Sequence, residues 1–238
     1  IRTYLGKTYR SIRAYDKSQE QLERAIELFE GESEIRSDAL TELALVHEAL
    51  GNYLQAEPML AVLLERKTKE LGENHDEVID AKIDLSTVYR RIGKVEKAED
   101  LCVSALTVIR DQNRSTEDPR MLKCMNELAK IFLAREKIAQ AESMSRNVFE
   151  RSRLSLGDKS SVSLIRGQVL VESLRKGGKL DEAEELSMNL VSSMEEILGP
   201  THPDTLGAMD ALAEIVVARE DLPRGLDLYE QILDSKER

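Results

Sequence analysis

Apolar residues recur along the chain at helical spacing, in pairs of segments joined by a short polar turn. Residues 76–92 mix six apolar positions at helical spacing, namely Ile79, Ile83, Leu85, Val88, Tyr89 and Ile92. Residues 95–109 place a second set on one face, namely Ala98, Leu101, Cys102, Ala105, Leu106 and Ile109. Gly93 stands between the two sets and suits the left-handed end of a helix. The pattern predicts two helices joined by a tight turn.

This layout repeats at a nearly constant step. The residue that ends the first helix stands at Gly51, Gly93, Glu136, Gly178 and Glu220, with steps of 42, 43, 42 and 42 residues. Five residues later comes a small residue that lets paired helices approach closely, at Ala56, Ala98, Ala141, Ala183 and Gly225. A shorter first unit has Ser18 at this position. A period in this range indicates a stacked-repeat protein, in which each unit buries its apolar face against its neighbours.

We therefore predict an all-α fold, an α-α superhelix built as a right-handed solenoid of about six antiparallel helix pairs. The predicted units cover residues 1–32, 33–75, 76–117, 118–160, 161–203 and 204–238, in a single solenoid domain over residues 1–238. The chain opens with Ile1 and enters a helical pattern at once. We therefore expect it to be a fragment of a larger protein.

The links between units also repeat. LGENHDEV and LGPTHPDTL place His75 and His202 at equivalent positions, three repeat steps apart. Because equivalent positions in distant units do not form one site, we expect both histidines to have a structural role in the linkers. The linker QNRSTEDPRM departs from the pattern and carries one extra residue. We expect the irregular joint of the solenoid there.

The units resemble tetratricopeptide repeats, whose small and large apolar signature positions are matched by Leu85, Ser86, Tyr89, Gly93, Ala98, Cys102 and Ala105. The 42-residue step and the LGxxHPxT-type linkers are similar to the kinesin light chain variety of these repeats. The double-Asn signature of that variety is reduced to Asn126-Glu127 in one unit. The resemblance implies a cytoplasmic protein-interaction scaffold.

The amino-acid composition agrees with a helical fold, and the net charge argues against some classes of binding partner. Charged residues make up 33% and aromatic residues 4%, without Trp, which is typical of Ala/Leu/Glu/Lys-rich helices. The net charge of -11 argues against nucleic-acid and anionic-membrane partners. Cys102 and Cys124 form no CxxC pair, which favours free thiols in a reducing, cytoplasmic compartment.

Fragments of catalytic motifs are incomplete. Gly6-Lys7-Thr8 resembles the end of a phosphate-binding loop, but Ile1 stands where that loop needs its first glycine. His47-Glu48 begins like HExxH, but Gly51 replaces the second histidine, and His47 takes the interior position that Tyr89 has in the next unit. We therefore predict no enzyme activity, no metal site and no cofactor.

The resemblance to tetratricopeptide repeats implies that the first helix of each pair lines a concave groove. Carried over position by position, the partner-binding residues are Arg10, Thr41, Glu48, Thr87, Arg90, Arg91, Lys123, Asn126, Lys130, Gln168, Glu172, Arg175 and Lys176. Further groove positions are Lys7, Asp38, Asp80, Asp210 and Glu214.

The groove differs in charge from the rest of the chain. Eight of its residues are basic and six acidic, so it carries about +2, whereas the remainder carries -13. Basic side chains attract carboxylates across an interface. We therefore predict an acidic peptide segment as the partner. The alternative is that these charges remain solvated or pair with one another.

The sequence thus favours a non-catalytic scaffold that binds a protein or peptide. Two alternatives remain, a regulatory or sensor domain of a larger signalling ATPase and a kinesin-light-chain-type cargo adaptor. The last helical segment leaves Leu226, Tyr229, Ile232 and Leu233 without a following polar cap. Since terminal repeats normally have a polar outer face, two alternatives are open: more repeats follow in the parent protein, or the chain self-associates through its terminal repeats.

Overall fold

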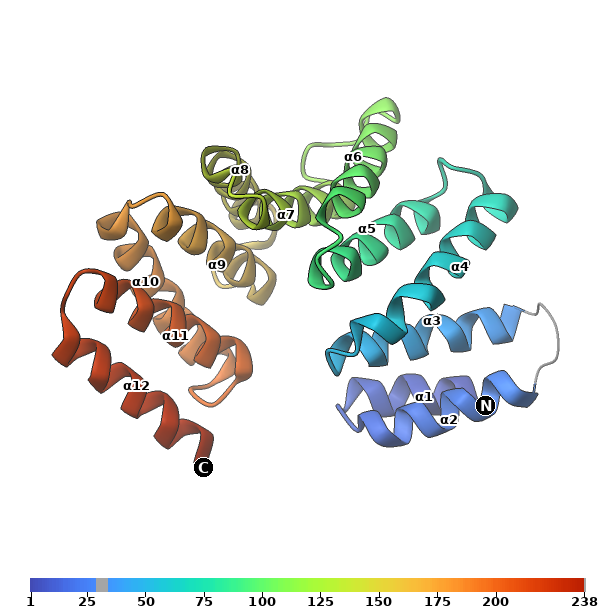
Figure 1. Ribbon diagram of the computed structural model, residues 1–238, viewed down its shortest axis with the longest axis horizontal. Coiled ribbons are helices and arrows are strands. Elements are labelled where there is room, and N and C mark those ends of the chain that lie inside the picture. Colours follow the sequence, from blue (N-terminus) through green and yellow to red (C-terminus); the bar gives the residue numbers. More distant parts are fainter. Residues whose placement is uncertain (29–33, 238) are drawn as a thin grey trace. The chain divides into compact units, whose positions relative to one another are not determined.

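The computed structural model describes residues 1–28 and 34–237, and every regular element in this part is an α-helix. The helices form consecutive pairs (Figure 1). They are α1 (Arg2–Ser11) with α2 (Tyr15–Leu28), α3 (Glu34–Ala49) with α4 (Tyr53–Leu71), α5 (Asp76–Arg91) with α6 (Val95–Asp111), α7 (Pro119–Ala134) with α8 (Ile138–Leu156), α9 (Ser161–Lys176) with α10 (Leu180–Leu198), and α11 (Pro203–Ala218) with α12 (Leu222–Glu237). The predicted fold class is confirmed.

The chain divides into two compact units, Ile1–Asn113 and Arg114–Arg238. We call these two parts the first unit and the second unit, and we call each repeat a helix pair. The first holds α1 to α6 and the second α7 to α12. The division falls within QNRSTEDPRM, the linker for which the sequence predicts an irregular joint. That the whole chain forms one solenoid stays a prediction.

The residue that ends each first helix has the left-handed backbone that the repeat predicts. Gly51, Gly93 and Gly178 have φ angles of 76°, 81° and 75°. Glu136 and Glu220 adopt the same conformation, with φ angles of 57° and 67°, although a side chain is unfavourable there. The left-handed turn is therefore kept at the two repeats that have glutamate in place of glycine.

Both linker histidines cap a helix. Nδ1 of His75 accepts a hydrogen bond from the backbone N–H of Glu77 at 3.2 Å, and Nδ1 of His202 accepts one from Asp204 at 3.2 Å. Each histidine is the N-cap residue of the following first helix, where a side-chain acceptor satisfies an otherwise unpaired N–H. In the irregular linker, Asp118 takes this role for α7. The structural role predicted for the histidines is explained by capping.

The repeated small residues lie where paired helices cross. Ala56, Ala98, Ala141 and Ala183 have no exposed surface. In the pair α5–α6, the hydroxyl of Ser86 donates to the carbonyl oxygen of Ala98 at 3.0 Å, so the two backbones are in close contact. In the pair α1–α2, the hydroxyl of Ser18 donates in the same way to the carbonyl oxygen of Gly6 at 2.7 Å. This contact leaves no room for a larger side chain.

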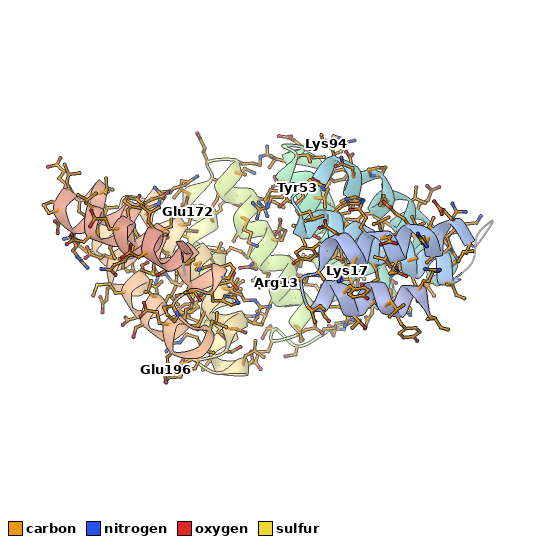
Figure 2. The ribbon with its side chains drawn as sticks, turned by 90° about the horizontal axis from the view of Figure 1, so that it is seen from below. Arg13, Lys17, Tyr53, Lys94, Glu172 and Glu196 are labelled. Carbon is orange, nitrogen blue, oxygen red and sulfur yellow. The ribbon has the colours of Figure 1, made fainter. Side chains whose placement is uncertain are left out.

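Ion pairs join successive helix pairs at a repeated position. A glutamate follows the small residue of α4, α6, α8 and α10, at Glu57, Glu99, Glu142 and Glu184. Nζ of Lys94 lies 2.5 Å from Glu57 (Lys94 is labelled in Figure 2), Nζ of Lys179 lies 2.7 Å from Glu142, and Nε of Arg219 lies 3.1 Å from Glu184. We call these contacts the inter-repeat ion pairs. They give the second helix of one pair a specific partner in the next.

His47 lies in the interior of α3, as its position in the repeat predicts. Its side chain is 7% exposed, and Nδ1 is buried without a hydrogen-bond partner in the described part of the chain. Burial lowers the pKa of His47 below its usual value of 6.5, against a smaller opposing effect of Glu23. The neutral imidazole is therefore the form that the folded state accommodates.

We expect the free energy of unfolding to fall between about pH 7.5 and about pH 5, because the unfolded chain then binds a proton on His47 that the folded chain excludes. The variant His47→Phe removes this proton and should reduce the fall. Urea unfolding of both proteins at several pH values measures the difference. An equally steep fall in His47→Phe would contradict the assignment.

Candidate functional site

The first helices lie on the inner side of each unit. In the first unit α1 contacts α3, and in the second unit α7 contacts α9 and α9 contacts α11, while the second helices pack against the first helices on either side. First helices of neighbouring pairs that contact one another lie on the concave side of a curved stack of helix pairs. All 13 predicted partner-binding residues lie on first helices. That they bind a partner stays a prediction.

In the first unit, Arg10 pairs with a carboxylate that the sequence analysis missed. Nε of Arg10 donates to Oε2 of Glu42 at 2.9 Å, and Nζ of Lys7 lies 3.7 Å from Oε1. Glu42 is only 8% exposed. Its position within the apolar run ALTELALV was the available signal, because a carboxylate among buried residues needs a cationic partner.

The other predicted groove residues of the first unit have varied surroundings. The hydroxyls of Thr41 and Thr87 donate to backbone carbonyls one turn earlier, at 2.9 and 3.2 Å, so their hydrogens are engaged by their own helices. The guanidinium of Arg91 lies 5.8 Å from the ring centre of Tyr53, in range for a cation–π contact. Tyr53 is labelled in Figure 2. Arg91 is exposed and Arg90 is half-buried.

In the second unit, four charges form a network on the inner faces of α9 and α11. Nε and Nη2 of Arg175 donate to the two oxygens of Glu172, at 2.8 and 2.9 Å. Nη2 of Arg175 also lies 3.3 Å from Glu214 on α11, and Lys176 lies 3.7 Å from Glu172. Figure 2 labels Glu172 on α9. The alternative that inner-face charges pair with one another is therefore confirmed for this set.

Two side-chain amides on the inner faces differ in their bonding. Nε2 of Gln168 donates to the carbonyl oxygen of Asp204 at 3.0 Å, which ties α9 to the start of α11. Asn126 on α7 is 9% exposed, and its Oδ1 is buried without a hydrogen-bond partner in the described residues. Nearby on α7, Lys130 lies 3.5 Å from Glu127, and Lys123 is exposed. Oδ1 of Asn126 thus has unused hydrogen-bonding capacity within the described residues.

Metal ligation, membrane insertion and thiol chemistry are other ways in which a helical chain can act. Residues 1–28 and 34–237 contain no cluster of three or more His, Cys, Asp or Glu side chains that could hold a metal ion. None of the helices in this part of the chain is both long and apolar enough to span a membrane. Cys102 and Cys124 are buried, and they form no disulfide in the described part of the chain.

Two tetratricopeptide-repeat family models match the chain, one over residues 36–111 and one over residues 169–204. Protein KINESIN LIGHT CHAIN-RELATED 2 of Arabidopsis thaliana is 22% identical, covering 84% of this chain and 35% of its own length. A second relative, Protein KINESIN LIGHT CHAIN-RELATED 3, is covered over 28% of its length. This chain thus spans about a third of the length of the curated relatives that it matches.

Solved structures share the fold. A protein of nearly identical TPR-like repeats from Podosopora anserina superposes with a TM-score of 0.68 at 22% identity, over 84% of this chain and 94% of that one. NprR, solved in complex with its cognate peptide NprX, superposes with a TM-score of 0.77 at 15% identity, over 99% of this chain and 66% of that one. At these identities the likeness concerns the fold alone.

Proposed function

Because this chain is a tetratricopeptide-repeat protein of the kinesin-light-chain-like type, we propose that it is a non-catalytic scaffold that binds a protein or peptide along the inner faces of its first helices. Stacked helix pairs support such a function, since they offer long surfaces lined by equivalent positions. The complex of NprR with a peptide supports it further, because that protein has the same fold.

The observation that carries the proposal is the carboxamide of Asn126. A buried acceptor without a donor costs about 1–3 kcal/mol, so such a group calls for an explanation. Because Asn126 is 9% exposed, a rotation of its side chain would bring Oδ1 to the surface, where a backbone N–H of an extended segment lying against α7 would satisfy it. A hydrogen bond between Asn126 and the backbone of the bound segment does not depend on the side chains of that segment.

The charges around Asn126 support an acidic segment. Lys123, Lys130, Arg175 and Lys176 supply cations on the neighbouring first helices α7 and α9 of the second unit. Partly exposed pairs such as Arg175 with Glu172 contribute only about 0–1 kcal/mol. A carboxylate of an incoming segment can therefore replace Glu172 at little cost, and the displaced Glu172 returns to water. A role as a regulatory domain or as a cargo adaptor would use the same surface.

The test compares the proteins that are captured by the wild-type chain and by two inner-face variants. One variant is Asn126→Ala. The other reverses four charges of the second unit together, Lys123→Glu, Lys130→Glu, Arg175→Glu and Lys176→Glu. Partners captured from a lysate are identified by mass spectrometry, and their affinities are then measured with the purified partner segment. Both variants should bind the partner at least about tenfold more weakly than the wild type.

The matched control reverses four cations on second helices, Lys69→Glu, Lys97→Glu, Arg110→Glu and Arg153→Glu. It changes the net charge by the same amount but leaves the inner faces intact, so it should retain the partner. Circular dichroism verifies that each variant is folded. Partner binding that survives in both inner-face variants, or that is lost in the control, argues against the proposal.

A further inference from the structure

The outer face of α12 carries a row of apolar side chains. Leu222, Leu226 and Leu233 are 63%, 59% and 60% exposed, and Tyr229 between them is half-buried. Steps of 4, 3 and 4 residues place the four side chains on one stripe of the helix. We call this stripe the α12 seam. Exposed stripes of this kind mark surfaces that bind another molecule.

The α12 seam differs in charge from the equivalent faces of the second helices before it. Leu226 occupies the position of Glu57, Glu142 and Glu184, the three carboxylates of the inter-repeat ion pairs. In α8 and α10, this face is covered by the first helix of the next pair, α9 and α11 respectively. Leu226 has no charge, so it cannot form the ion pair that Glu142 and Glu184 form with the next helix pair. The seam therefore lacks the carboxylate that forms the inter-repeat ion pairs of α4, α8 and α10.

Tyr229 also makes the face unlike those of α8 and α10. It stands where these helices have Ser145 and Ser187, which are buried against the next helix pair. The hydroxyl of Ser145 donates to the hydroxyl of Ser173 on α9 at 3.2 Å, so small residues permit close approach there. The side chain of Tyr229 is larger than either serine and than Leu60, the equivalent residue of α4. Tyr229 therefore cannot make the close serine–serine contact by which α9 packs on α8.

Acidic residues border the α12 seam on both sides. On α12, Asp227, Glu230 and Asp234 lie in one row beside it, are exposed, and form no ion pair within the described residues. On the other side, Asp210 and Glu214 of α11 lie close enough to Tyr229 to raise the pKa of its hydroxyl, after the larger effect of burial. An apolar stripe between two acidic rows is complementary to a helix with one apolar face and cationic flanks.

We propose that the α12 seam is a docking surface for a cationic amphipathic helix of a partner protein. The apolar face of that helix covers Leu222, Leu226, Tyr229 and Leu233, and its Lys or Arg side chains reach the two acidic rows. A second copy of this chain would bring identical acidic rows together, so charge disfavours it. The two surfaces share Glu214, which pairs with Arg175. The seam itself lies on α12, apart from Asn126 and the cations of α7, and the variants below leave α11 unchanged, so each proposal can fail without the other.

The probe is a synthetic helix of about 20 residues, long enough to be helical, built from Leu and Lys with its leucines in the 4-3-4 spacing. Its binding to the 238-residue chain is measured by fluorescence anisotropy. A scrambled peptide of the same composition controls for attraction by net charge alone. The designed helix should bind more tightly than the scrambled peptide, and added salt should weaken binding only in part.

Two chain variants carry equal changes in charge. Leu226→Glu restores the residue of α4, α8 and α10 at the centre of the seam, and should weaken binding about tenfold or more because it buries a carboxylate under the apolar face. Leu154→Glu places the same charge on α8, where Leu154 is 82% exposed, and should leave binding unchanged. Equal binding by both variants, or equal binding of the designed and scrambled peptides, overturns the proposal.

Two further measurements complete the test. The pair Glu230→Lys and Asp234→Lys reverses one acidic row without touching the seam, and should also weaken binding; unchanged binding overturns the proposal even if Leu226→Glu does not fold. Light scattering gives the mass of the chain without peptide, and a value of 26.9 kDa supports a free seam. A dimer that Leu226→Glu converts to a monomer assigns the seam to a second copy instead and overturns the proposal.

Discussion

Replacement of Ala98 by leucine is expected to lower the free energy of unfolding by about 1–3 kcal/mol. Ala98 has no exposed surface, and its carbonyl oxygen accepts a hydrogen bond from Ser86 on the paired helix at 3.0 Å. Three additional carbon atoms at this crossing would push α5 and α6 apart, and would break the hydrogen bond that joins them. Urea unfolding followed by circular dichroism measures the loss.

The control for this change lies on the same helix. Val103 of α6 is 49% exposed, so Val103→Leu enlarges a side chain that faces water. Its free energy of unfolding should stay within about 0.5 kcal/mol of the wild type. If Ala98→Leu were as stable as Val103→Leu, the close crossing of the paired helices would not be what the repeated small residue provides.

Replacement of Arg166 by methionine is expected to raise the free energy of unfolding by about 1–3 kcal/mol. Arg166 on α9 is 8% exposed, and Nη1 donates to the buried hydroxyl of Ser152 at 2.7 Å. No carboxylate pairs with it within the described residues, and burial lowers the pKa of its guanidinium. Ser152 keeps its own bond to the carbonyl oxygen of Val148 when Arg166 is replaced. Urea unfolding of the variant and the wild type measures the gain.

The equivalent positions of Arg166 in α3, α5, α7 and α11 are Ala39, Ala81, Cys124 and Ala208, which shows that the fold accepts an uncharged residue there. Lys82→Met is the matched comparison, because Lys82 is a cation of similar burial whose Nζ lies 2.5 Å from Glu73. That variant should gain no stability, since it removes an ion pair. A loss of stability in Arg166→Met would mean that the bond to Ser152 outweighs the cost of burying the charge.

The helix pairs were predictable because their signals are local. The repeated Gly51, Gly93 and Gly178 mark a left-handed turn, and a residue in that conformation ends a helix whatever lies around it. The apolar positions at helical spacing show which face is buried, since within each compact unit one helix pair packs against the next. For the same reason, Ala98 and Ala183 could be assigned to helix crossings before any contact was known.

The partners of individual charges were not predictable in the same way. Arg10 pairs with Glu42, 32 residues later, and Arg175 pairs with both Glu172 and Glu214, the last of which lies on a different helix. These distances depend on how neighbouring helices are spaced and rotated, and the repeat constrains this only on average. The sequence placed the inner-face cations correctly on first helices, but it could not tell which of them have carboxylate partners.

By itself, the sequence determined the all-α repeat fold, the ends of the helices, the small residues at the crossings and the assignment of the predicted partner-binding residues to first helices. These features follow from a period of about 42 residues, which can be recognised in the sequence without knowledge of any spatial contact. Only the tertiary structure decided which polar groups are satisfied. In the structure Arg10 pairs with Glu42, and His75 and His202 cap helices. Among residues 1–28 and 34–237, Oδ1 of Asn126 is buried without a donor and the buried guanidinium of Arg166 has no carboxylate partner. The physical reason is that hydrogen bonds and ion pairs act over a few ångströms, so they depend on the spatial arrangement of helices that are far apart in the chain.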